Sequence, residues 1–264
     1  MVRRPLGNHL HGADTLLVTS ETAQTPPLPT PSESLRALVA AARFVLFDFD
    51  GPVCRLFAGH RAEQVAAEQV RWLEERGLRG LLTAEELTEP DPQSVLRAVA
   101  ARHPKSDLVA ELEERLTQQE LKAVATAWPT PYADPLIRTW RATGVPLAIT
   151  TNNSAKAARG YLEGRGLAEC FSPHFYGRTE DLRLLKPDPH CLRRALNALG
   201  AEPSAALMIG DTPTDLRAAE RAGVSFLGYA RNEDSEGRLR EAGAEHLVST
   251  LQPLLELVRG RRSS

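Results

Sequence analysis

Two carboxylates stand one residue apart directly after a short apolar stretch. The apolar residues 45–47 lead into Asp48, Phe49, Asp50 and Gly51. Alternate side chains of a strand share a face, so the pattern predicts that Asp48 and Asp50 start out on the same side. Two carboxylates placed in this way can bind a metal ion, attack an electrophile or move a proton. The alternative is an ordinary turn, because Asp and Gly are also common turn residues.

More polar residues follow two later apolar stretches and occupy the segment between them. These residues are Thr150, Thr151, Asn152, Asn153, Lys186, Gly210, Asp211 and Asp215. Short apolar stretches alternate with helical patterns after residue 128, and this alternation predicts an α/β fold with a doubly wound parallel sheet. Ligands bind beyond the carboxyl ends of such strands, so residues that lie far apart in the sequence are expected to converge there.

Each of these residue types has a physical use at such a site. Clustered carboxylates bind a hard divalent cation such as Mg²⁺. A hydroxyl group and backbone N–H groups at a helix N-terminus bind phosphate, and strand alignment favours Thr151 over Thr150 for this contact. Lys186, one of four lysines in the chain, could offset the charge of a phosphoryl group; otherwise it is a solvated surface residue. Asp215 could also be a first-turn acid that the helix dipole favours.

Residues 54–127 have an almost purely helical pattern that interrupts the α/β alternation. Helices are expected over about residues 61–76, 91–103 and 106–125, the second of them starting at Asp91. Their Leu and Val residues recur at helical spacing, which indicates packing of one helix against another. The sequence therefore predicts a helical segment inserted after the first strand of the sheet.

The composition is that of an ordinary soluble globular protein, with 42% hydrophobic and 25% charged residues among 264. A net charge of −2 predicts no basic surface for nucleic acid or a membrane. The three cysteines lack the spacing of a disulfide framework or a zinc site, which indicates a reducing compartment, and we expect the cytoplasm. Residues 1–31 are expected to form a disordered tail, and residues 259–264 a C-terminal tail.

The four groups of residues resemble, in order, the four motifs of the haloacid dehalogenase-like (HAD) hydrolase superfamily. The segments that carry the resemblance are Asp48-Phe49-Asp50-Gly51, Thr151-Asn152, Lys186-Pro187 and Gly210-Asp211 with Asp215. The inserted helices resemble the helical cap of the phosphoglycolate phosphatase-like and β-phosphoglucomutase-like branch. The resemblance covers about residues 44–250. It implies a Rossmann-like core of residues 32–53 and 128–258, with a mobile cap of residues 54–127.

The resemblance implies a function as well as a fold. The implied enzyme is a Mg²⁺-dependent phosphatase that hydrolyses a small phosphorylated metabolite through an aspartyl-phosphate intermediate. Matched by position, Asp48 is implied as the nucleophile. Asp50 is implied as the general acid for the leaving alcohol and then as the base for the attacking water. Thr151, Asn152 and Lys186 are implied to hold the phosphate, and Lys186 to stabilise the charge on Asp48.

The same resemblance implies a metal site and a set of partners. Asp48, the backbone carbonyl of Asp50 and Asp211 are implied as Mg²⁺ ligands, with Asp215 supporting the ion directly or through water. Arg55, just past the first motif, is a candidate for contact with an anionic leaving group. The expected partner is a small phosphorylated metabolite. We expect a monomer or homodimer, without nucleic acid or membrane partners.

Two positions call for separate expectations. Pro52 stands two residues after the second Asp, where the family usually has Thr or Val. Proline has no N–H to donate, so a supporting hydrogen bond of the first motif is expected to be absent or replaced. Arg178 is expected to form a structural ion pair rather than to contact substrate.

Other functions within the superfamily are open alternatives. A dehalogenase needs neither Mg²⁺ nor an acid for a halide leaving group, so Asp50 and Asp211 argue against one. A phosphonatase typically lacks the second Asp and adds a cap lysine, for which Lys105 and Lys122 are the candidates, but Asp50 argues against this function too. A phosphomutase shares all four motifs. A non-catalytic binding or regulatory protein is the alternative outside the enzymes, and only Pro52 favours it.

Overall fold

A six-stranded parallel sheet forms the centre of the protein, as the alternating pattern predicted. The computed structural model describes residues 32–261, so the predicted tail over residues 1–31 lies outside the described part. The strands are β1 (Phe44–Phe47), β2 (Cys54–Arg55), β3 (Trp128–Pro129), β4 (Leu147–Thr150), β5 (Phe175–Tyr176), β6 (Ala206–Gly210), β7 (Ser225–Tyr229) and β8 (Leu247–Val248). The sheet order is β5-β4-β1-β6-β7-β8, while β2 and β3 form a separate antiparallel pair.

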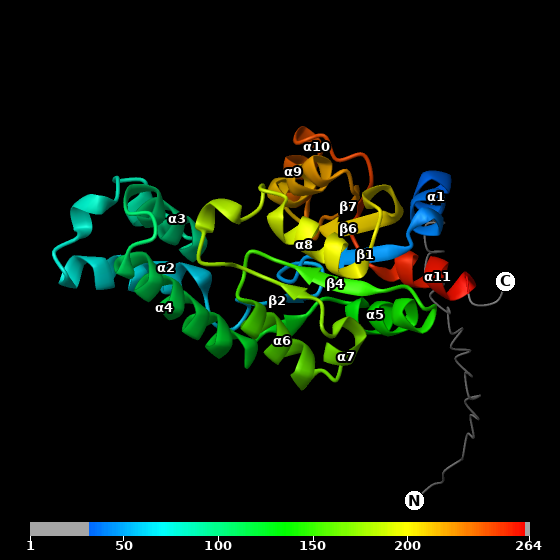
Figure 1. Cartoon of the computed structure of the whole chain (residues 1–264), viewed down its shortest axis with the longest axis horizontal. Helices are drawn as coiled ribbons and strands as arrows, with labels where there is room; N and C mark the ends of the chain where they lie inside the picture. Colours follow the sequence, from blue (N-terminus) through cyan, green and yellow to red (C-terminus); the bar gives the residue numbers. More distant parts are fainter. Residues whose placement is uncertain (1–31, 262–264) are drawn as a thin grey trace, which may run out of the picture. The chain divides into compact units, whose positions relative to one another are not determined.

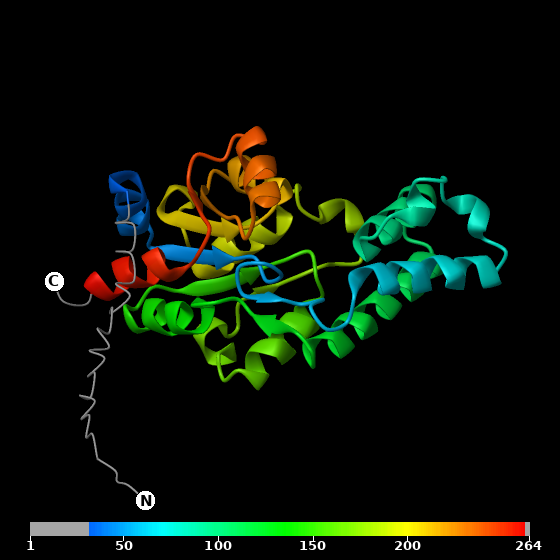
Figure 2. The same cartoon turned by 180° about the vertical axis from the view of Figure 1, so that it is seen from behind.

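Helices cover both faces of this sheet (Figures 1 and 2). The α-helices are α1 (Glu33–Ala41), α2 (Ala62–Glu75), α3 (Pro92–Arg102), α4 (Asp107–Val124), α5 (Ala133–Ala142), α6 (Ala155–Gly164), α7 (Ala168–Phe171), α8 (His190–Leu199), α9 (Pro213–Ala222), α10 (Glu233–Glu241) and α11 (Gln252–Gly260). Short 3₁₀ turns are η1 (Arg79–Leu81), η2 (Glu86–Thr88), η3 (Leu182–Leu184) and η4 (Pro203–Ala205). None of the helices within residues 32–261 is long and apolar enough to cross a membrane.

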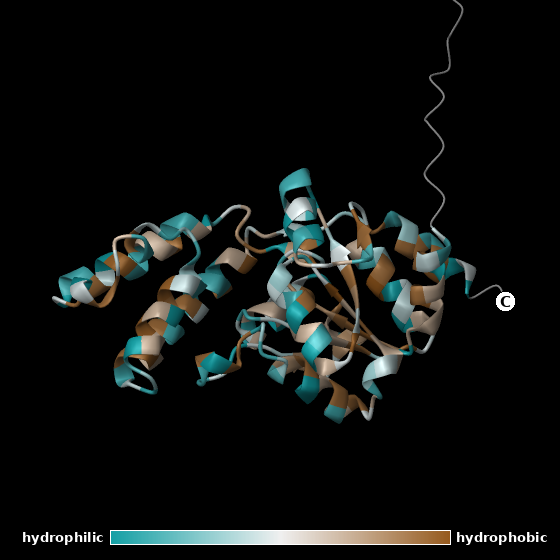
Figure 3. Ribbon diagram, turned by 90° about the horizontal axis from the view of Figure 1, so that it is seen from above, coloured by the Kyte–Doolittle hydropathy of each residue, from teal (hydrophilic) through white to brown (hydrophobic). Residues whose placement is uncertain are grey.

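The two faces of the sheet bury different sets of side chains. Val45 and Phe47 of β1 pack with residues of α1, α5, α6, α7 and α11. Leu46, which points the opposite way, packs with residues of α8, α9 and α10. Figure 3 shows the strands as mostly hydrophobic ribbons between helices of mixed hydropathy. This two-sided burial explains why the strands are apolar throughout and do not alternate with polar residues.

Helix boundaries follow capping residues that the sequence already contains. Ser32, Asp91 and Ser106 accept a hydrogen bond from the first turn of α1, α3 and α4, which leaves fewer unpaired N–H groups there. Gly200 and Gly223 end α8 and α9 in the left-handed region, with φ of 60° and 72°. Glycine adopts this conformation without the steric cost that other residues meet.

Helices α2, α3 and α4 form a separate layer, which we name the helical insert. Its own core includes Val65 and Leu73 of α2, Val95 of α3, and Leu112 and Leu116 of α4. These are the apolar positions at helical spacing that predicted packing of helix against helix. The insert follows β2 and precedes β3, so the short antiparallel β2–β3 pair lies at its entry and exit.

Two helices and two short strands were not predicted from the sequence. Helix α10 is rich in charged residues and buries only Ser235 and Leu239, so its apolar periodicity is too weak to detect. It is nevertheless well defined, because Asn232 and Ser235 form a reciprocal capping box. Helix α7 has four residues, and β2 and β3 have two each, which is below the length at which a periodic pattern can be recognised.

Candidate active site

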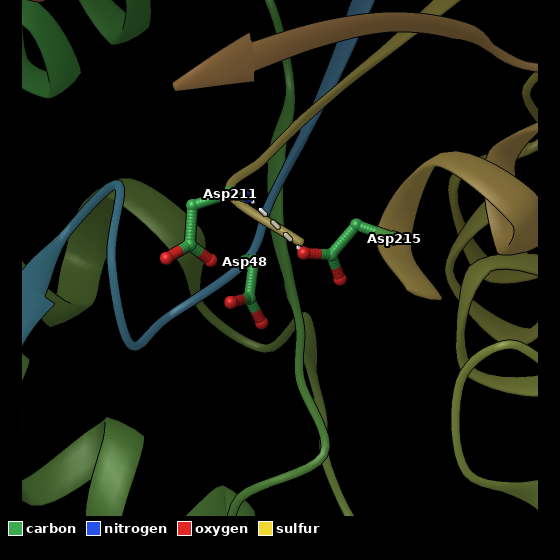
Figure 4. Close-up of side chains that lie close together, drawn as sticks. All are labelled: Asp48, Asp211 and Asp215. Carbon is green, nitrogen blue, oxygen red and sulfur yellow. Dashed lines mark hydrogen bonds between the residues drawn. The ribbon is translucent and has the colours of Figure 1, made fainter. Parts of the chain in front are cut away.

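Three carboxylates and one lysine meet at the carboxyl end of the sheet. Asp48 follows β1, Asp211 follows β6 and Asp215 lies in the first turn of α9 (Figure 4). One carboxylate oxygen from each of the three lies within 4.8 Å of the others. The Lys186 ammonium donates to Oδ1 of Asp48 at 2.7 Å and lies 2.5 Å from Oδ1 of Asp215. The residues that the sequence placed in three different motifs are therefore in contact.

Sheet register explains this convergence. Strand β1 lies between β4 and β6, with Phe47 level with Ile149 on one side and Ile209 on the other. The backbone N–H of Asp48 continues the pairing by donating to the carbonyl of Ile209 at 2.8 Å. Parallel strands in register end at the same edge, so the polar residues that follow them must lie side by side.

Two glycines allow the backbone to approach the carboxylates closely. Gly51 has φ of 127°, and a Cβ atom there would collide with the Asp211 carboxylate. A Cβ atom at Gly210 would lie 2.5 Å from that of Asp215. A side chain at either position would displace an acid, so both glycines are needed for the compact site.

Burial and charge repulsion set the protonation of the acids. Burial, with the nearby Asp215 carboxylate, raises the pKa of Asp48 to about 7, although Lys186 acts in the opposite direction. Burial and the charge of Asp48 raise the pKa of Asp211 well above its ordinary value. Burial alone would lower the pKa of Lys186, but Asp215 and Asp48 outweigh it and raise this pKa. The site therefore holds more negative charge than Lys186 can neutralise.

Asp50 lies in the same cavity as Asp48 but in a different environment. Its Oδ1 accepts a hydrogen bond of 2.8 Å from the backbone N–H of Leu56. Burial raises the pKa of Asp50 to about 6, while the Leu56 hydrogen bond and the positive charge of Arg231 lower it. A carboxyl group with a pKa near neutrality can release and recover a proton, which is what a general acid and base requires.

The raised pKa of Asp50 predicts a pH-dependent gain in stability on its substitution. The folded state holds this proton more tightly than the unfolded chain, whose carboxyl has the ordinary pKa of 3.8. The contribution of Asp50 to the free energy of unfolding is therefore fully present below pH 3.8. It is lost as the pH rises through 6, and the loss is at most about 3 kcal/mol. Asparagine has no proton to lose and can still accept from Leu56. Asp50→Asn should raise the melting temperature of the metal-free protein at pH 7.5 and change it little at pH 4. Scanning calorimetry in chelator checks this, and an equal change at both pH values would contradict it.

The residues after β4 form a tightly bonded loop. The side chain of Asn152 is fixed to the backbone of Lys186, because its Oδ1 accepts from the N–H at 2.8 Å and its Nδ2 donates to the carbonyl at 3.2 Å. The Thr151 hydroxyl is buried and donates to Oδ1 of Asn153 at 3.1 Å. The hydroxyl of Thr150 instead donates to the sulfur of Met208 at 3.3 Å, within the sheet. Of the two threonines, Thr151 is thus the one bonded within the loop.

Pro52 fits into a turn that needs no N–H group at this position. The N–H of Gly51 donates to the carbonyl of Cys54 at 2.6 Å, and the N–H of Cys54 donates to the carbonyl of Phe49 at 3.1 Å. The hydroxyl of Thr130 donates to the carbonyl of Gly51 at 2.5 Å. These three hydrogen bonds hold the turn after the two acids, and none of them uses a donor at position 52.

A cavity of about 350 Å³ opens in front of these groups. Its lining includes Asp48, Asp50, Asn152, Lys186 and Asp215 from the core and Arg97 from the helical insert. Arg55 is not among the lining residues. Its guanidinium lies over the ring of the exposed Trp128, 5.5 Å from the ring centroid. The structure thus brings together all the predicted site residues except Arg55. Thr151 and Asp211 are not among the lining residues, but Thr151 is bonded to Asn153, which lines the cavity, and Asp211 belongs to the acidic cluster.

Comparison with known proteins agrees with this arrangement. Residues 42–223 match the family described as haloacid dehalogenase-like hydrolase, which is more than half of the chain. The chain belongs to this family.

Two relatives and one solved structure illustrate the similarity of this HAD-like hydrolase to known proteins. It is 41% identical over 113 residues to the phosphoglycolate phosphatase of Rhodospirillum rubrum, covering 41% of the chain and 45% of the relative. It is 32% identical over 125 residues to the pyrophosphatase PpaX of Halalkalibacterium halodurans, covering 46% and 56%. The chain thus matches about half the length of these relatives. A predicted phosphatase from Clostridium acetobutylicum has the same fold, with a TM-score of 0.60, 18% identity and coverage of 82% and 98%.

The acidic cluster of this HAD-like hydrolase has the features of a cation site. Oδ1 of Asp211 is buried and has no hydrogen-bond partner among residues 32–261. Unpaired buried oxygens are rare in folded proteins and often belong to a site for an ion or water. Burial and the negative charge of Asp48 also raise the pKa of Asp211. A hard divalent cation such as Mg²⁺ binds oxygen ligands of this kind, so the residues present fit it.

A buried ion-pair network behind the loop was only partly foreseen. Arg178 forms the structural ion pair that the sequence predicted, with Glu113 at 2.9 Å and Glu120 at 2.8 Å. Glu120 of α4 was missed, although it also accepts from Nδ2 of Asn153 at 3.0 Å and from the N–H of Ser154 at 2.9 Å. The signal was its position, four residues after the buried Leu116. A charged residue on the apolar stripe of a predicted helix must find a partner.

Proposed function

We propose that this HAD-like hydrolase is a cytoplasmic phosphatase that hydrolyses a small phosphorylated metabolite, with Mg²⁺ as its cofactor. The observation that carries the proposal is the contact of 2.7 Å between Asp48 and Lys186, in a cavity that also holds Asp50. The buried Lys186 ammonium lowers the pKa of Asp48 against the effect of burial and holds the carboxylate at the cavity, and the ionised form is the one that can act as a nucleophile. Two relatives named for the cleavage of phosphate esters or anhydrides support the same class of reaction.

The two aspartates would act in sequence. An oxygen of Asp48 attacks phosphorus and forms an aspartyl-phosphate, while the bond from phosphorus to the leaving oxygen breaks. Asp50 gives its proton to that leaving oxygen and later takes a proton from the water that attacks the aspartyl-phosphate. This second step releases inorganic phosphate and regenerates the Asp48 carboxylate. The pKa of about 6 suits Asp50 to both transfers.

The remaining predicted residues would hold the phosphoryl group. Lys186 lies between Asp48 and Asp215 and balances charge when the phosphoryl group gains electron density. The backbone and side chain of Asn152 and the buried Thr151 form the loop at the start of α6, where N–H groups favour an anion. The hydrogen bonds between Asn152 and Lys186 keep these two groups in a fixed relation.

Asp48, Asp211 and the backbone carbonyl of Asp50 would hold the Mg²⁺ ion. When bound, the ion supplies positive charge that offsets the charge of the carboxylates and of the phosphoryl oxygens. Asp215 would support it indirectly, because its Oδ2 already accepts from the N–H groups of Asp211 and Thr212, at 3.2 and 3.0 Å. In this way Asp215 fixes the backbone that carries Asp211, besides pairing with Lys186.

The test of the proposed function is phosphate release in the presence and absence of metal. The wild-type protein should release phosphate from a panel of phosphate monoesters with Mg²⁺, and chelation by EDTA should abolish this release. Asp211→Asn should raise the Mg²⁺ concentration for half-maximal activity by at least about 10-fold, since it removes a charged ligand.

Asp188→Asn is the matched control for the metal test. Asp188 caps the first turn of α8 through the N–H of His190, a bond that asparagine can also accept, and lies outside the acidic cluster. Its Mg²⁺ dependence should equal that of the wild type. Isomerised sugar phosphate as the product would identify a phosphomutase instead. Absence of phosphate release from the whole panel by correctly folded protein with Mg²⁺ would favour a non-catalytic binding protein.

A further inference from the structure

Arg97 extends from the helical insert to the proposed catalytic residues. It lies in the middle of α3, and its guanidinium donates to the backbone carbonyl of Lys186 at 3.2 Å. The same carbonyl accepts from Asn152, so Arg97 is tied to the loop proposed to hold the phosphoryl group. Arg97 lines the cavity of about 350 Å³ that holds Asp48 and Asp50. A cationic side chain thus faces the cavity from the side opposite the sheet.

The charge of Arg97 is not neutralised by a direct ion pair. No carboxylate of residues 32–261 lies within 4.0 Å of its nitrogens, and its Nε is buried without a hydrogen-bond partner among them. Asp91, which also lines the cavity, favours the charged form of Arg97, but its oxygens already accept from the N–H of Gln93 and the hydroxyl of Ser94. The other cation of the cavity, Lys186, is paired with Asp48 and Asp215. Arg97 therefore has spare donors that a ligand can use.

We propose that Arg97 recognises a second anionic group, a carboxylate or a phosphoryl group, on the leaving part of the substrate. This inference rests on the proposed phosphatase function and narrows its substrate class. The phosphoryl group that is transferred must lie against Asp48 and Lys186, so the rest of the substrate extends towards the insert. A planar guanidinium can bind a carboxylate or phosphate through two parallel hydrogen bonds, and its bond to Lys186 limits its rotation.

The two relatives are consistent with this substrate class. Phosphoglycolate carries a carboxylate beside its phosphate, and pyrophosphate carries a second phosphoryl group, and these are the compounds for which the relatives are named. Arg55, the residue that the sequence suggested for such a contact, lies on Trp128 outside the cavity. The competing interpretation is that Arg97 only fastens the insert to the core.

A pair of esters that differ in one charged group distinguishes these interpretations. In 2-phosphoglycolate the leaving alcohol carries a carboxylate, whereas in ethyl phosphate it carries a methyl group. Arg97→Gln should lower kcat/KM for 2-phosphoglycolate by about 10- to 100-fold, the usual loss for a hydrogen bond to a charged group. Its kcat/KM for ethyl phosphate should change by less than about 3-fold. Arg97→Lys should retain part of the preference for 2-phosphoglycolate, because lysine keeps the positive charge but cannot form two parallel hydrogen bonds.

Arg102→Gln serves as the matched control on the same helix. Arg102 pairs with Glu86 at 2.9 Å and is not among the residues that line the cavity. Its loss should leave the ratio of the two kcat/KM values unchanged. An equal fall for both esters in Arg97→Gln would overturn the proposal and assign Arg97 a purely structural role.

A binding measurement separates failure of this inference from failure of the proposed function. Calorimetric titration of 2-phosphoglycolate and ethyl phosphate is carried out on Asp48→Asn and on Asp48→Asn/Arg97→Gln, so no turnover is needed. Tighter binding of 2-phosphoglycolate that disappears with Arg97 supports the proposal. Equal affinity of both esters in both proteins contradicts it. Absence of hydrolysis by the wild-type protein contradicts the phosphatase function alone.

Discussion

Replacing Asp48 with asparagine should abolish phosphate release, lowering kcat by about four orders of magnitude or more. The amide of asparagine is not a nucleophile and cannot form the proposed aspartyl-phosphate. Asparagine has nearly the same shape, so the surrounding residues can keep their positions. The substitution also removes one of the acids whose repulsion raises the pKa of Asp211. The variant should therefore be at least as stable as the wild type in metal-free buffer, which separates loss of chemistry from loss of folding.

Two measurements check this prediction. Phosphate release from an aryl phosphate with Mg²⁺ gives the rate, and mass spectrometry after acid quenching detects a phosphoryl group on the wild-type protein only. Asp188→Asn is the matched control, because asparagine can also accept from the N–H of His190 and Asp188 is not among the residues that line the cavity. It should retain the aryl phosphatase activity within a few-fold. Turnover by Asp48→Asn equal to that of the wild type would exclude Asp48 as the nucleophile.

The residues at the sheet edge could be predicted because parallel strands impose their arrangement. Asp48 and Asp211 follow strands that pair in register, so their closeness follows from the order of the strands. Lys186 and Asp48 lie 138 residues apart in the sequence, and their contact was expected only through the resemblance to a known family. No local pattern around Lys186 indicates that its ammonium is buried rather than solvated.

Contacts between the insert and the core could not be predicted in the same way. Helical periodicity identifies which face of α3 and α4 is apolar, but it does not give the direction in which the insert lies. Arg97 and Glu120 contact the loop after β4 and the residues around Lys186 only because of that direction. Arg55 is the converse case: its position near the first motif suggested substrate contact, whereas Trp128 of the neighbouring strand holds it outside.

The ion pair between Arg178 and Glu120 leads to the largest expected effect on stability. The side chains of both residues have an exposed fraction of 0%. Glu120 belongs to α4 of the insert, and it accepts from Asn153 and Ser154 of the loop that leads into α6. The pKa of Arg178 is raised because the charges of Glu120 and Glu113 outweigh its burial. This network joins the insert to the core through charges that are out of contact with water.

Arg178→Met should lower the free energy of unfolding by about 3–5 kcal/mol, because it leaves the Glu120 carboxylate buried without its cation. For a chain of this size, the melting temperature should fall by on the order of 10 °C. The double variant Arg178→Met/Glu120→Gln should recover much of this loss. Glutamine carries no charge that would be left buried without a partner, and its oxygen can still accept from Asn153 or Ser154. Arg240→Met should cost less than about 1 kcal/mol, because its pair with Glu236 is exposed.

Thermal and urea unfolding of the four proteins measure these differences. A loss in the double variant as large as in Arg178→Met would show that lost packing, and not a stranded charge, is the cause. The same variants also report on the site. Glu120 holds Asn153, which accepts from the Thr151 hydroxyl, so the single variant should bind inorganic phosphate more weakly even below its unfolding temperature. Recovery of phosphate affinity together with stability in the double variant would tie both effects to the charge of Glu120. The stability of the fold and the affinity for phosphate would then both depend on the buried Glu120 carboxylate, which belongs to the insert and binds the core loop through Asn153 and Ser154.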